Sequence, residues 1–308
     1  MKLMKDLTSF VSEAKRPLIV ILGPTASGKT ALSLKIAHKI NGEIISADSC
    51  QIYRGMDIAT DAILAEQMEK IPHHLLRIAD PDETITLAEY KELALQAINE
   101  VYAKGHIPVL VGGTGLYLSS IIEDYKIPQI PPDARLREKL QKEAEKSGPI
   151  ALYEKLRELD PKSAKSIHPN NLRYVIRALE INLSGKQKKR DSKSKKPPYD
   201  IFMIDINWPR EKLYERVGLR VDIQLKRGLV QEVKRLLEKY DPSLPSMSAL
   251  GIKEIIPYIK GEDSLEKCIE ILKMNTRRYA KRQMTWFRRY KNIVRLTPEQ
   301  LECILNSK

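Results

Sequence analysis

Gly23-Pro24-Thr25-Ala26-Ser27-Gly28-Lys29-Thr30 decides the fold, because it matches the phosphate-binding-loop pattern G-x-x-x-x-G-K-[ST]. The wholly apolar run Leu18 to Leu22 stands directly before it and is typical of a central parallel strand that is buried on both faces. After the loop, Leu32, Ile36 and Ile40 recur at helical spacing. Strand, glycine-rich loop and helix therefore follow one another in the order that a phosphate-binding loop (P-loop) requires.

The residue types of this loop suit a bound phosphate chain. Glycines let backbone N–H groups approach an anion closely, and the start of the following helix adds positive partial charge. We expect Lys29 to reach the terminal phosphates and the hydroxyl of Thr30 to bind Mg²⁺. The pattern predicts an enzyme that holds a di- or triphosphate, and it does not distinguish ATP from other such compounds. The residues expected to bind it are Gly23, Pro24, Thr25, Ala26, Ser27, Gly28, Lys29 and Thr30.

Strand and helix patterns alternate along the first half of the chain and again after residue 200. Apolar strand segments stand at 43–48, 107–111 and 201–206. A capping box at Thr86 and Glu89 opens a helix between the first two of them. This alternation predicts an α/β fold in which the P-loop belongs to a doubly wound parallel sheet.

The pattern changes at the proline-rich stretch 127–133, which is typical of a domain linker. Three helical segments without a strand follow, at about 133–147, 150–159 and 170–184. We expect a small all-helical insertion domain at 127–199, inside a P-loop core domain made of 1–126 and 200–308. In the core, helices are expected to continue from Pro209 to the end of the chain, with a long one at about 265–290.

Basic residues outnumber acidic ones, and the excess is clustered. The 308-residue chain has 53 Lys and Arg against 40 Asp and Glu, a formal net charge of +13. The tract 186–196 and the stretch 277–291 are both heavily basic. Clustering favours a polyanionic partner such as nucleic acid over a simple gain in solubility. For the tract 186–196, contact with RNA and a role as a solvated linker both stay open.

The sequence shows no sign of a membrane or secretory protein. It has no run of about 18 apolar residues and no signal-peptide pattern at its N-terminus. Cys50, Cys268 and Cys303 are far apart and form no C-x-x-C pair, which argues against a disulfide framework or a zinc knuckle. We expect a cytoplasmic monomer.

Polar residues follow two of the predicted strands, at the sheet edge where such folds bind ligands. Asp48 ends one strand and is either a metal ligand or a general base. Gly112-Gly113-Thr114-Gly115 ends the other, where glycines permit close backbone approach and Thr114 offers a hydroxyl to a developing anion. Asp205 is interpreted as a plain strand-end residue, and His73-His74 as a structural pair held by hydrogen bonds or loop packing.

The long C-terminal helix carries basic residues in a regular pattern. At 100° per residue, Arg278, Arg282 and Arg289 share one face, which can follow a sugar-phosphate backbone. A solvated basic face is the commoner explanation of such a pattern. Gln283 and Trp286 lie in the same stretch, and they favour a binding role.

Together these segments resemble the tRNA dimethylallyltransferases, also called tRNA isopentenyltransferases, over nearly the whole chain. Each landmark is modestly specific, but seven stand in the family's order after the P-loop. They are Asp48–Asp57, Pro72–Leu75, Gly112–Tyr117, His168–Asn171, Arg177–Glu180, Leu250–Glu254 and Thr276–Gln283. The cysteine count agrees with the bacterial type, which lacks the C-terminal zinc finger of eukaryotic members.

The resemblance implies transfer of a dimethylallyl group from its diphosphate to N6 of the adenosine just 3′ of a tRNA anticodon. Dimethylallyl diphosphate and the anticodon stem-loop of tRNA would be the partners, with the donor diphosphate in the P-loop beside Mg²⁺. The family match assigns Asp48 as the base for the adenine amine, and Thr114 and Arg220 as groups that stabilise the leaving diphosphate. Gln51 suits adenine, which must be flipped out of the anticodon loop.

The resemblance also carries over a set of tRNA-binding positions, on the insertion and on the core. They are Asp48, Ser49, Cys50, Gln51, Thr114, Arg137, Arg173, Tyr174, Val175, Ile176, Arg177, Gly251, Ile252, Lys253, Thr276, Arg277, Arg278, Tyr279, Ala280, Lys281, Arg282 and Gln283. Ala59, Tyr174 and Ile252 depart from the family's usual residues. None of the three replaces a proposed catalytic group, and the last two bear on how RNA is held.

Three other functions fit part of the pattern. A small-molecule kinase would use Asp48 as its base with ATP in the loop, but it has no need of the basic helix. An adenylate isopentenyltransferase would prenylate a free nucleotide, and the insertion and the basic stripe argue against it. A non-enzymatic RNA-binding protein would not need Lys29, Thr30 and Asp48 together.

Overall fold

The structure is a computed structural model that describes residues 2–128, 130–184 and 197–307. The chain divides into two compact units, one made of Met1–Asp124 with Lys195–Lys308 and the other of Tyr125–Ser194. We call the first the core unit and the second the insertion unit. Each is described by itself below.

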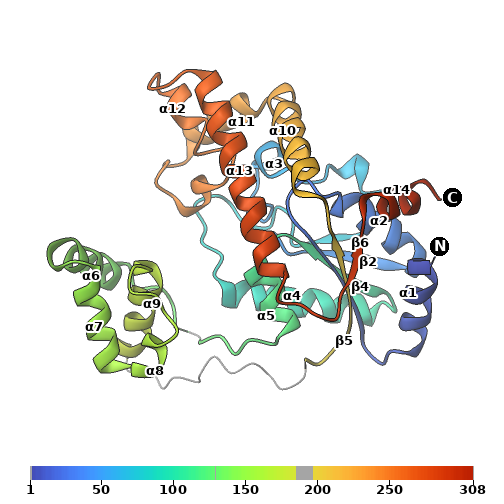
Figure 1. The fold of residues 1–308 in the computed structure, drawn as a ribbon, viewed down its shortest axis with the longest axis horizontal. Helices are drawn as coiled ribbons and strands as arrows, with labels where there is room; N and C mark the ends of the chain where they lie inside the picture. The colour runs from blue at the N-terminus through green and yellow to red at the C-terminus, as the bar shows by residue number, and fades with distance from the viewer. Residues whose placement is uncertain (1, 129, 185–196, 308) are drawn as a thin grey trace. The chain divides into compact units, whose positions relative to one another are not determined.

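A parallel sheet lies at the centre of the core unit (Figure 1). Its strands are β1 (Pro17–Leu22), β2 (Gly42–Ser46), β3 (His73–His74), β4 (Ile107–Gly112), β5 (Asp200–Ile206) and β6 (Val294–Leu296). Their order is β3-β2-β4-β1-β5-β6, and every neighbouring pair runs parallel. Since strands lie on both sides of β1, the chain winds outward in both directions, and the predicted doubly wound α/β fold is confirmed.

Helices cover both faces of this sheet. One face packs against α1 (Lys2–Glu13), α2 (Lys29–Ile40) and α14 (Pro298–Asn306), and the other against α4 (Leu87–Ala103) and α5 (Gly115–Ile122). On β1, Ile19 and Ile21 join the first core, whereas Leu18, Val20 and Leu22 join the second. Successive side chains of a strand point to opposite faces, so a strand covered on both sides must be apolar throughout.

Two further helices of the core unit border the candidate site. They are α10 (Arg210–Lys226) and α13 (Leu265–Phe287), which pack against each other and are tied by an ion pair of 2.6 Å between Asp222 and Lys273. The shorter elements are α3 (Asp57–Thr60), α11 (Leu229–Lys239), α12 (Ile256–Ile259) and the 3₁₀ turns η1 (Ala65–Gln67) and η2 (Pro245–Ser248). None of the described helices is long and apolar enough to cross a membrane.

The insertion unit is helical in the part that the structure describes. Its helices are α6 (Ala134–Ser147), α7 (Pro149–Leu159), α8 (Pro161–Ala164) and α9 (Leu172–Leu183). Leu140, Leu152, Leu156 and Leu179 form their shared core and are at most 1% exposed. These leucines put an apolar stripe on one face of each helix. A single short helix cannot cover its own apolar face, so the helices pack together and cover one another's.

The C-terminal part of the core unit differs from the sequence-based expectation. Helices were expected to continue to the end of the chain, but β6 pairs with β5 in register, with Asp205 opposite Arg295. The prediction that only helices follow Pro209 is wrong at β6. This strand has three residues, which are too few to show the alternation of polar and apolar side chains that identifies a strand. The elements α1 and β3 were not expected either, and the long helix ends at Phe287 rather than at residue 290.

Glu43 is a buried carboxylate at β2 that ties β2, β3 and the start of β4 together. It shares hydrogen bonds of 2.6 Å with His74 Nε2 and with His106 Nδ1, and it accepts one of 3.1 Å from Lys104 Nζ. Burial alone would raise the pKa of Glu43, but the hydrogen bonds with His74, His106 and Lys104 hold it below its ordinary value. The structural hydrogen bonding expected of the His73-His74 pair is confirmed at His74.

Replacing Glu43 with Gln should lower the free energy of unfolding by about 3 kcal/mol, because His74, His106 and Lys104 lose their buried counter-charge. A folded-state pKa below the ordinary value means that this stabilisation exists above pH 4.5 and is lost as the pH falls through the folded-state pKa. Urea unfolding near neutral pH and in acid measures both effects. Glu66→Gln, at an exposed site, is the control. Equal unfolding midpoints for wild type and Glu43→Gln near neutral pH contradict this role.

Candidate active site

The P-loop starts where β1 ends and closes onto the first turn of α2. Ala26 has φ of 62° and Gly28 has φ of 98°, so both lie in the left-handed region. Gly28 immediately precedes α2, and a Cβ there would lie 3.2 Å from Cδ2 of Leu301 in α14. Left-handed residues of this kind turn successive N–H groups toward one concave side. The loop therefore offers an anion the N–H groups of a helix start.

Two arginines one turn apart on α10 hold the loop from one side. Arg216 Nε donates to Ala26 O at 2.8 Å, and Arg220 Nη1 donates to Thr25 Oγ1 at 2.6 Å. Arg220 also donates to Thr60 O at 3.1 Å. The resemblance pointed to Arg220, whereas Arg216 was not predicted, although its i, i+4 spacing from Arg220 puts both on one helix face.

Gln283 of α13 and Trp208, just before α10, hold the loop at two other points. Gln283 Oε1 accepts a hydrogen bond from Thr25 N at 2.8 Å, and its Nε2 donates to Gly113 O at 2.9 Å. Trp208 Nε1 donates to Ser27 O at 2.9 Å. The hydroxyl of Ser27 is buried and has no hydrogen-bond partner among the described residues. No pattern in the sequence pointed to the role of Trp208.

Lys29 lies within the curve of the loop. Its Nζ donates to Pro24 O at 2.8 Å. Burial lowers the pKa of Lys29 to about 8, with Arg220 adding to the shift and the carboxylates of Asp48 and Asp205 opposing it. An incoming anion would favour the charged amine, so the site gains electrostatic stabilisation when a phosphate chain binds.

Asp48 follows β2 in a tight turn that fixes one of its oxygens. Oδ1 accepts hydrogen bonds from Cys50 N at 2.9 Å and from Gln51 N at 3.4 Å, and Oδ2 has no partner among the described residues. Burial and the charge of Asp48 raise the pKa of the Cys50 thiol to about 12, so the thiol stays neutral. Gln51 Nε2 donates to Thr60 O at 3.2 Å. The carboxylate is thus oriented by its turn, with one oxygen left to accept a proton.

Thr114 follows β4 and lies beside the Asp48 turn. Its Oγ1 accepts a hydrogen bond from Ser49 N at 3.0 Å and donates one to Ser49 Oγ at 3.3 Å. A Cβ on Gly112 would lie 2.1 Å from Ala47 O, so glycine is required where the ends of β2 and β4 meet. This close approach brings the predicted hydroxyl and the predicted carboxylate to one edge of the sheet.

Thr30, the expected magnesium ligand, is the second residue of α2 and is exposed. No hydrogen bond occupies its side-chain hydroxyl within the described part of the chain. A hydroxyl beside Lys29 at the helix start fits Mg²⁺, which usually keeps several waters and binds through substrate phosphates with few protein ligands.

The expected tRNA-binding residues of the core unit divide into two groups. Some are exposed or partly exposed: Asp48, Ser49, Cys50, Gln51, Thr114, Lys253, Arg277, Arg278, Tyr279, Lys281 and Arg282. Others are buried in the protein: Gly251, Ile252, Thr276, Ala280 and Gln283. The side chains of the second group are covered by other parts of the core unit.

In the insertion unit the same set contains both packed and exposed side chains. Arg137 and Arg177 both bind the carboxylate of Glu180, whose side chain is 2% exposed, and Arg137 Nη2 lies 2.8 Å from Glu180 Oε2. Val175 and Ile176 are buried, whereas Arg173 and Tyr174 are exposed. Arg173 and Tyr174 are therefore the members of this stretch that the described unit leaves open to a partner. The basic tract 186–196 lies outside the described residues.

The predicted stripe of three arginines is shorter than expected. Arg278 and Arg282 are exposed on α13, but the helix ends at Phe287 and Arg289 lies beyond it. The guanidinium of Arg289 lies 4.5 Å from the centre of the Trp286 ring and 3.7 Å from Glu123 Oε1. The prediction failed at Arg289 because it assumed that the helical twist continues to residue 290.

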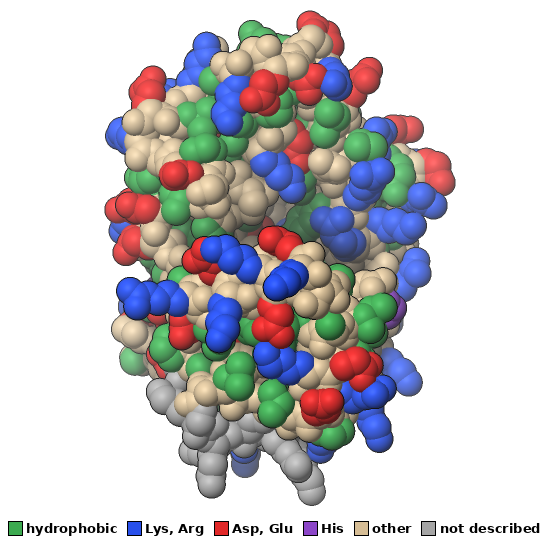
Figure 2. Space-filling model, turned by 90° about the vertical axis from the view of Figure 1, so that its left-hand side faces the viewer, with side chains coloured by type: hydrophobic (Ala, Val, Ile, Leu, Met, Phe, Trp, Pro, Cys, Tyr) green, Lys and Arg blue, Asp and Glu red, His purple; other side chains and the backbone are tan. Residues whose placement is uncertain are grey.

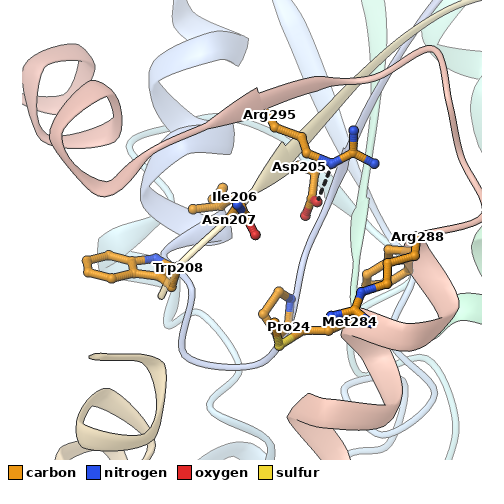
Figure 3. A pocket seen from close by; sticks show the side chains of 9 residues that line it. Pro24, Asp205, Ile206, Asn207, Trp208, Met284, Arg288 and Arg295 are labelled. Carbon is orange, nitrogen blue, oxygen red and sulfur yellow. Dashed lines mark ion pairs between the residues drawn. The ribbon is translucent and has the colours of Figure 1, made fainter. Parts of the chain in front are cut away.

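A pocket of about 210 Å³ opens beside Pro24, next to the end of β5. Figure 3 shows the Asp205 carboxylate in its wall with an ion pair to Arg295, whose Nε lies 3.8 Å from Asp205 Oδ2. Burial raises the pKa of Asp205, and the charges of Arg295 and Lys29 oppose that shift. The pairing with Arg295 suits the plain strand-end role expected of Asp205.

Figure 2 shows one face of the molecule, on which Lys and Arg side chains gather in groups with Asp and Glu between them. The formal net charge of +13 suits a polyanionic partner.

A P-loop at the carboxyl edge of a doubly wound sheet, with a carboxylate and a hydroxyl beside it, defines a phosphate-binding enzyme of the P-loop class. The family model described as IPP transferase matches residues 51–290. The chain belongs to the IPP transferase family.

Relatives and solved structures agree with this membership. The tRNA dimethylallyltransferase of Acetivibrio thermocellus is 47% identical over 290 residues, which cover 92% of this chain and 93% of that protein. The tRNA isopentenylpyrophosphate transferase from Bacillus halodurans has a TM-score of 0.70 at 42% identity, covering 94% of this chain and 95% of that chain. A eukaryotic dimethylallyltransferase acting on tRNA has a TM-score of 0.79 at 32% identity, covering 92% of this chain and 74% of that chain. The predicted family is confirmed.

Binding of inorganic diphosphate should weaken as the pH rises through about 8, because Lys29 then loses the charge that faces the anion. Above that pH the affinity for diphosphate should fall by about tenfold per pH unit, because Lys29 must take up a proton whenever the anion binds. Calorimetric titrations across this range measure the effect. The Lys29→Arg variant keeps a positive charge at all these pH values. Its affinity for diphosphate should therefore change with pH only through the protonation of diphosphate itself. Identical pH profiles for the two proteins would show that Lys29 does not titrate there.

Proposed function

We propose that this chain transfers a dimethylallyl group from dimethylallyl diphosphate to N6 of the adenosine 3′-adjacent to the anticodon in tRNA, releasing diphosphate. One observation carries the proposal: the free Oδ2 of Asp48 and the hydroxyl of Thr114 lie on adjoining turns at the sheet edge that also holds the P-loop. A base, a donor to a leaving group and a diphosphate site are what this transfer needs. The names of the relatives support the choice of donor group and of tRNA.

The donor diphosphate would bind in the P-loop. Lys29 and Arg220 supply positive charge, and the buried, unpartnered hydroxyl of Ser27 supplies a donor that an anion in the loop could satisfy. Thr30 would hold Mg²⁺ together with the diphosphate oxygens. The ion would supply further neutralisation of the leaving anion.

The reaction breaks the bond between the allylic carbon and its phosphate oxygen and forms a bond from that carbon to N6. Both electrons of the broken bond leave with the diphosphate, so the carbon gains cationic character. Arg220 and Thr114 favour this step by stabilising the departing oxygens. The amine loses one proton as the new bond forms, and Asp48 accepts it through Oδ2.

The adenosine must leave the stack of the anticodon loop to reach Asp48. Exposed Arg277, Arg278, Lys281 and Arg282 of α13 provide charge for the RNA backbone on the core unit. Arg173 and Tyr174 provide exposed polar and aromatic groups on the insertion unit. Gln51 can accept from the adenine amine, because its amide oxygen has no partner in the described part of the chain.

The function is tested by incubating the protein with dimethylallyl diphosphate, Mg²⁺ and a tRNA with adenosine at the position after the anticodon. Mass spectrometry of the digested RNA should show a prenylated adenosine, and the same tRNA with guanosine at that position should stay unmodified. Release of phosphate from ATP without prenylated tRNA would instead support a small-molecule kinase.

Replacing Asp48 with Asn should lower kcat by about 100-fold or more, because the amide cannot accept the proton from N6. Affinity for inorganic diphosphate should change far less than kcat, since no hydrogen bond among the described residues joins Asp48 to the loop and its charge acts on Lys29 only at a distance. Single-turnover kinetics and calorimetry measure the two quantities. Asp82→Asn, at an exposed site, is the matched control. Full turnover by Asp48→Asn means that another group is the base.

A further inference from the structure

Gln283 differs from its neighbours on α13 in what its side chain touches. It is 5% exposed, whereas Lys281, Arg282 and Thr285 on the same helix are exposed. Both ends of its amide are used inside the protein, by Thr25 N at 2.8 Å and by Gly113 O at 2.9 Å. Each polar atom of the side chain is thus engaged inside the protein, and burial covers the amide from a partner outside.

The two partners of Gln283 lie in the two loops that handle the donor. Thr25 belongs to the P-loop, and Gly113 immediately precedes Thr114. One partner is a backbone donor and the other a backbone acceptor, so a neutral amide satisfies both, while a carboxylate or an amine satisfies only one.

The amide of Gln283 packs so closely against Gly113 that a side chain at position 113 would collide with it. A Cβ on Gly113 would lie 2.3 Å from Gln283 Nε2, so the glycine is what lets the amide reach the Gly113 carbonyl. The two hydrogen bonds of Gln283 therefore join the P-loop to the Gly112–Thr114 turn beyond the last strand pairing, Leu22 with Gly112. Their loss would let Thr114 shift relative to the P-loop.

We propose that Gln283 is a positioning residue for the prenyl donor rather than a contact to RNA. It holds the P-loop and the Thr114 turn in one arrangement, so that the N–H groups of the loop and the hydroxyl of Thr114 face the same diphosphate. The inference rests on the proposed function for the identity of the donor. In this proposal the exposed face of α13 contacts RNA, and its buried face positions the prenyl donor.

The experiment compares Gln283→Met and Gln283→Glu with wild type in binding inorganic diphosphate and an anticodon stem-loop RNA. Gln283→Met leaves Thr25 N and Gly113 O unpaired, and diphosphate should bind about tenfold more weakly. Gln283→Glu keeps the volume of the side chain and the hydrogen bond from Thr25 N. It also places a carboxylate against Gly113 O and near the anion, so its affinity for diphosphate should fall further than that of Gln283→Met. RNA affinity should stay near that of wild type for both variants.

Steady-state kinetics give a second readout. KM for dimethylallyl diphosphate should rise and KM for tRNA should not change, and kcat should fall because Thr114 is displaced. Gln231→Met, the same change at an exposed position of α11, is the matched control and should change none of these values.

Two results overturn the proposal. Weaker RNA binding with unchanged diphosphate binding would make Gln283 an RNA contact, and equal losses of both with a lower melting temperature would make it a fold residue only. Failure of the proposed function looks different: wild type would bind diphosphate and RNA and yet form no prenylated tRNA. The effect of Gln283 on diphosphate binding would still be measured in that case.

Discussion

The backbone of the P-loop, held in one shape at the end of β1, is the constraint on which the rest of the structure depends. Its anion-facing groups are N–H groups and Lys29, so the shape of the main chain matters more than most of its side chains. That shape is secured from outside by Arg216, Trp208 and Gln283. Since these three come from distant parts of the sequence, the P-loop is complete only when α10 and α13 have packed over the sheet.

The electrostatics of the site follow from the same packing. Burial lowers the pKa of Lys29 to about 8, and the nearby guanidinium of Arg220 adds to the shift. Two positive groups held close together in a covered loop repel each other until an anion arrives between them. The protein therefore carries an unfavourable interaction in the free state, and a diphosphate removes it on binding. This arrangement suits an anion that must later be stabilised as a leaving group.

Local patterns predicted the parts of the fold that form locally, and they failed where tertiary contacts decide. The helix expected after the P-loop has the bounds of α2, because its apolar spacing and flanking glycine lie within the segment itself. Strand β6 escaped prediction because its three residues become a strand only by pairing with β5. The family resemblance carried Ile176, Ile252 and Gln283 over as RNA contacts, and the structure adds that all three side chains are buried, which the motifs do not indicate. A shared motif says that residues are alike and says nothing of what each one touches.

The buried and exposed positions of α13 divide the helix into the two faces on which the proposed roles depend. Leu272, Thr276, Ala280, Gln283 and Phe287 recur at spacings of three and four, so they line the face that packs against the core unit. Four of the basic residues between them, Arg277, Arg278, Lys281 and Arg282, are exposed. Substitutions on the exposed face can change RNA contacts without moving the amide that holds the P-loop. Changes on the buried face act on the donor site first, because Gln283 is bonded directly to the loop that would bind the diphosphate.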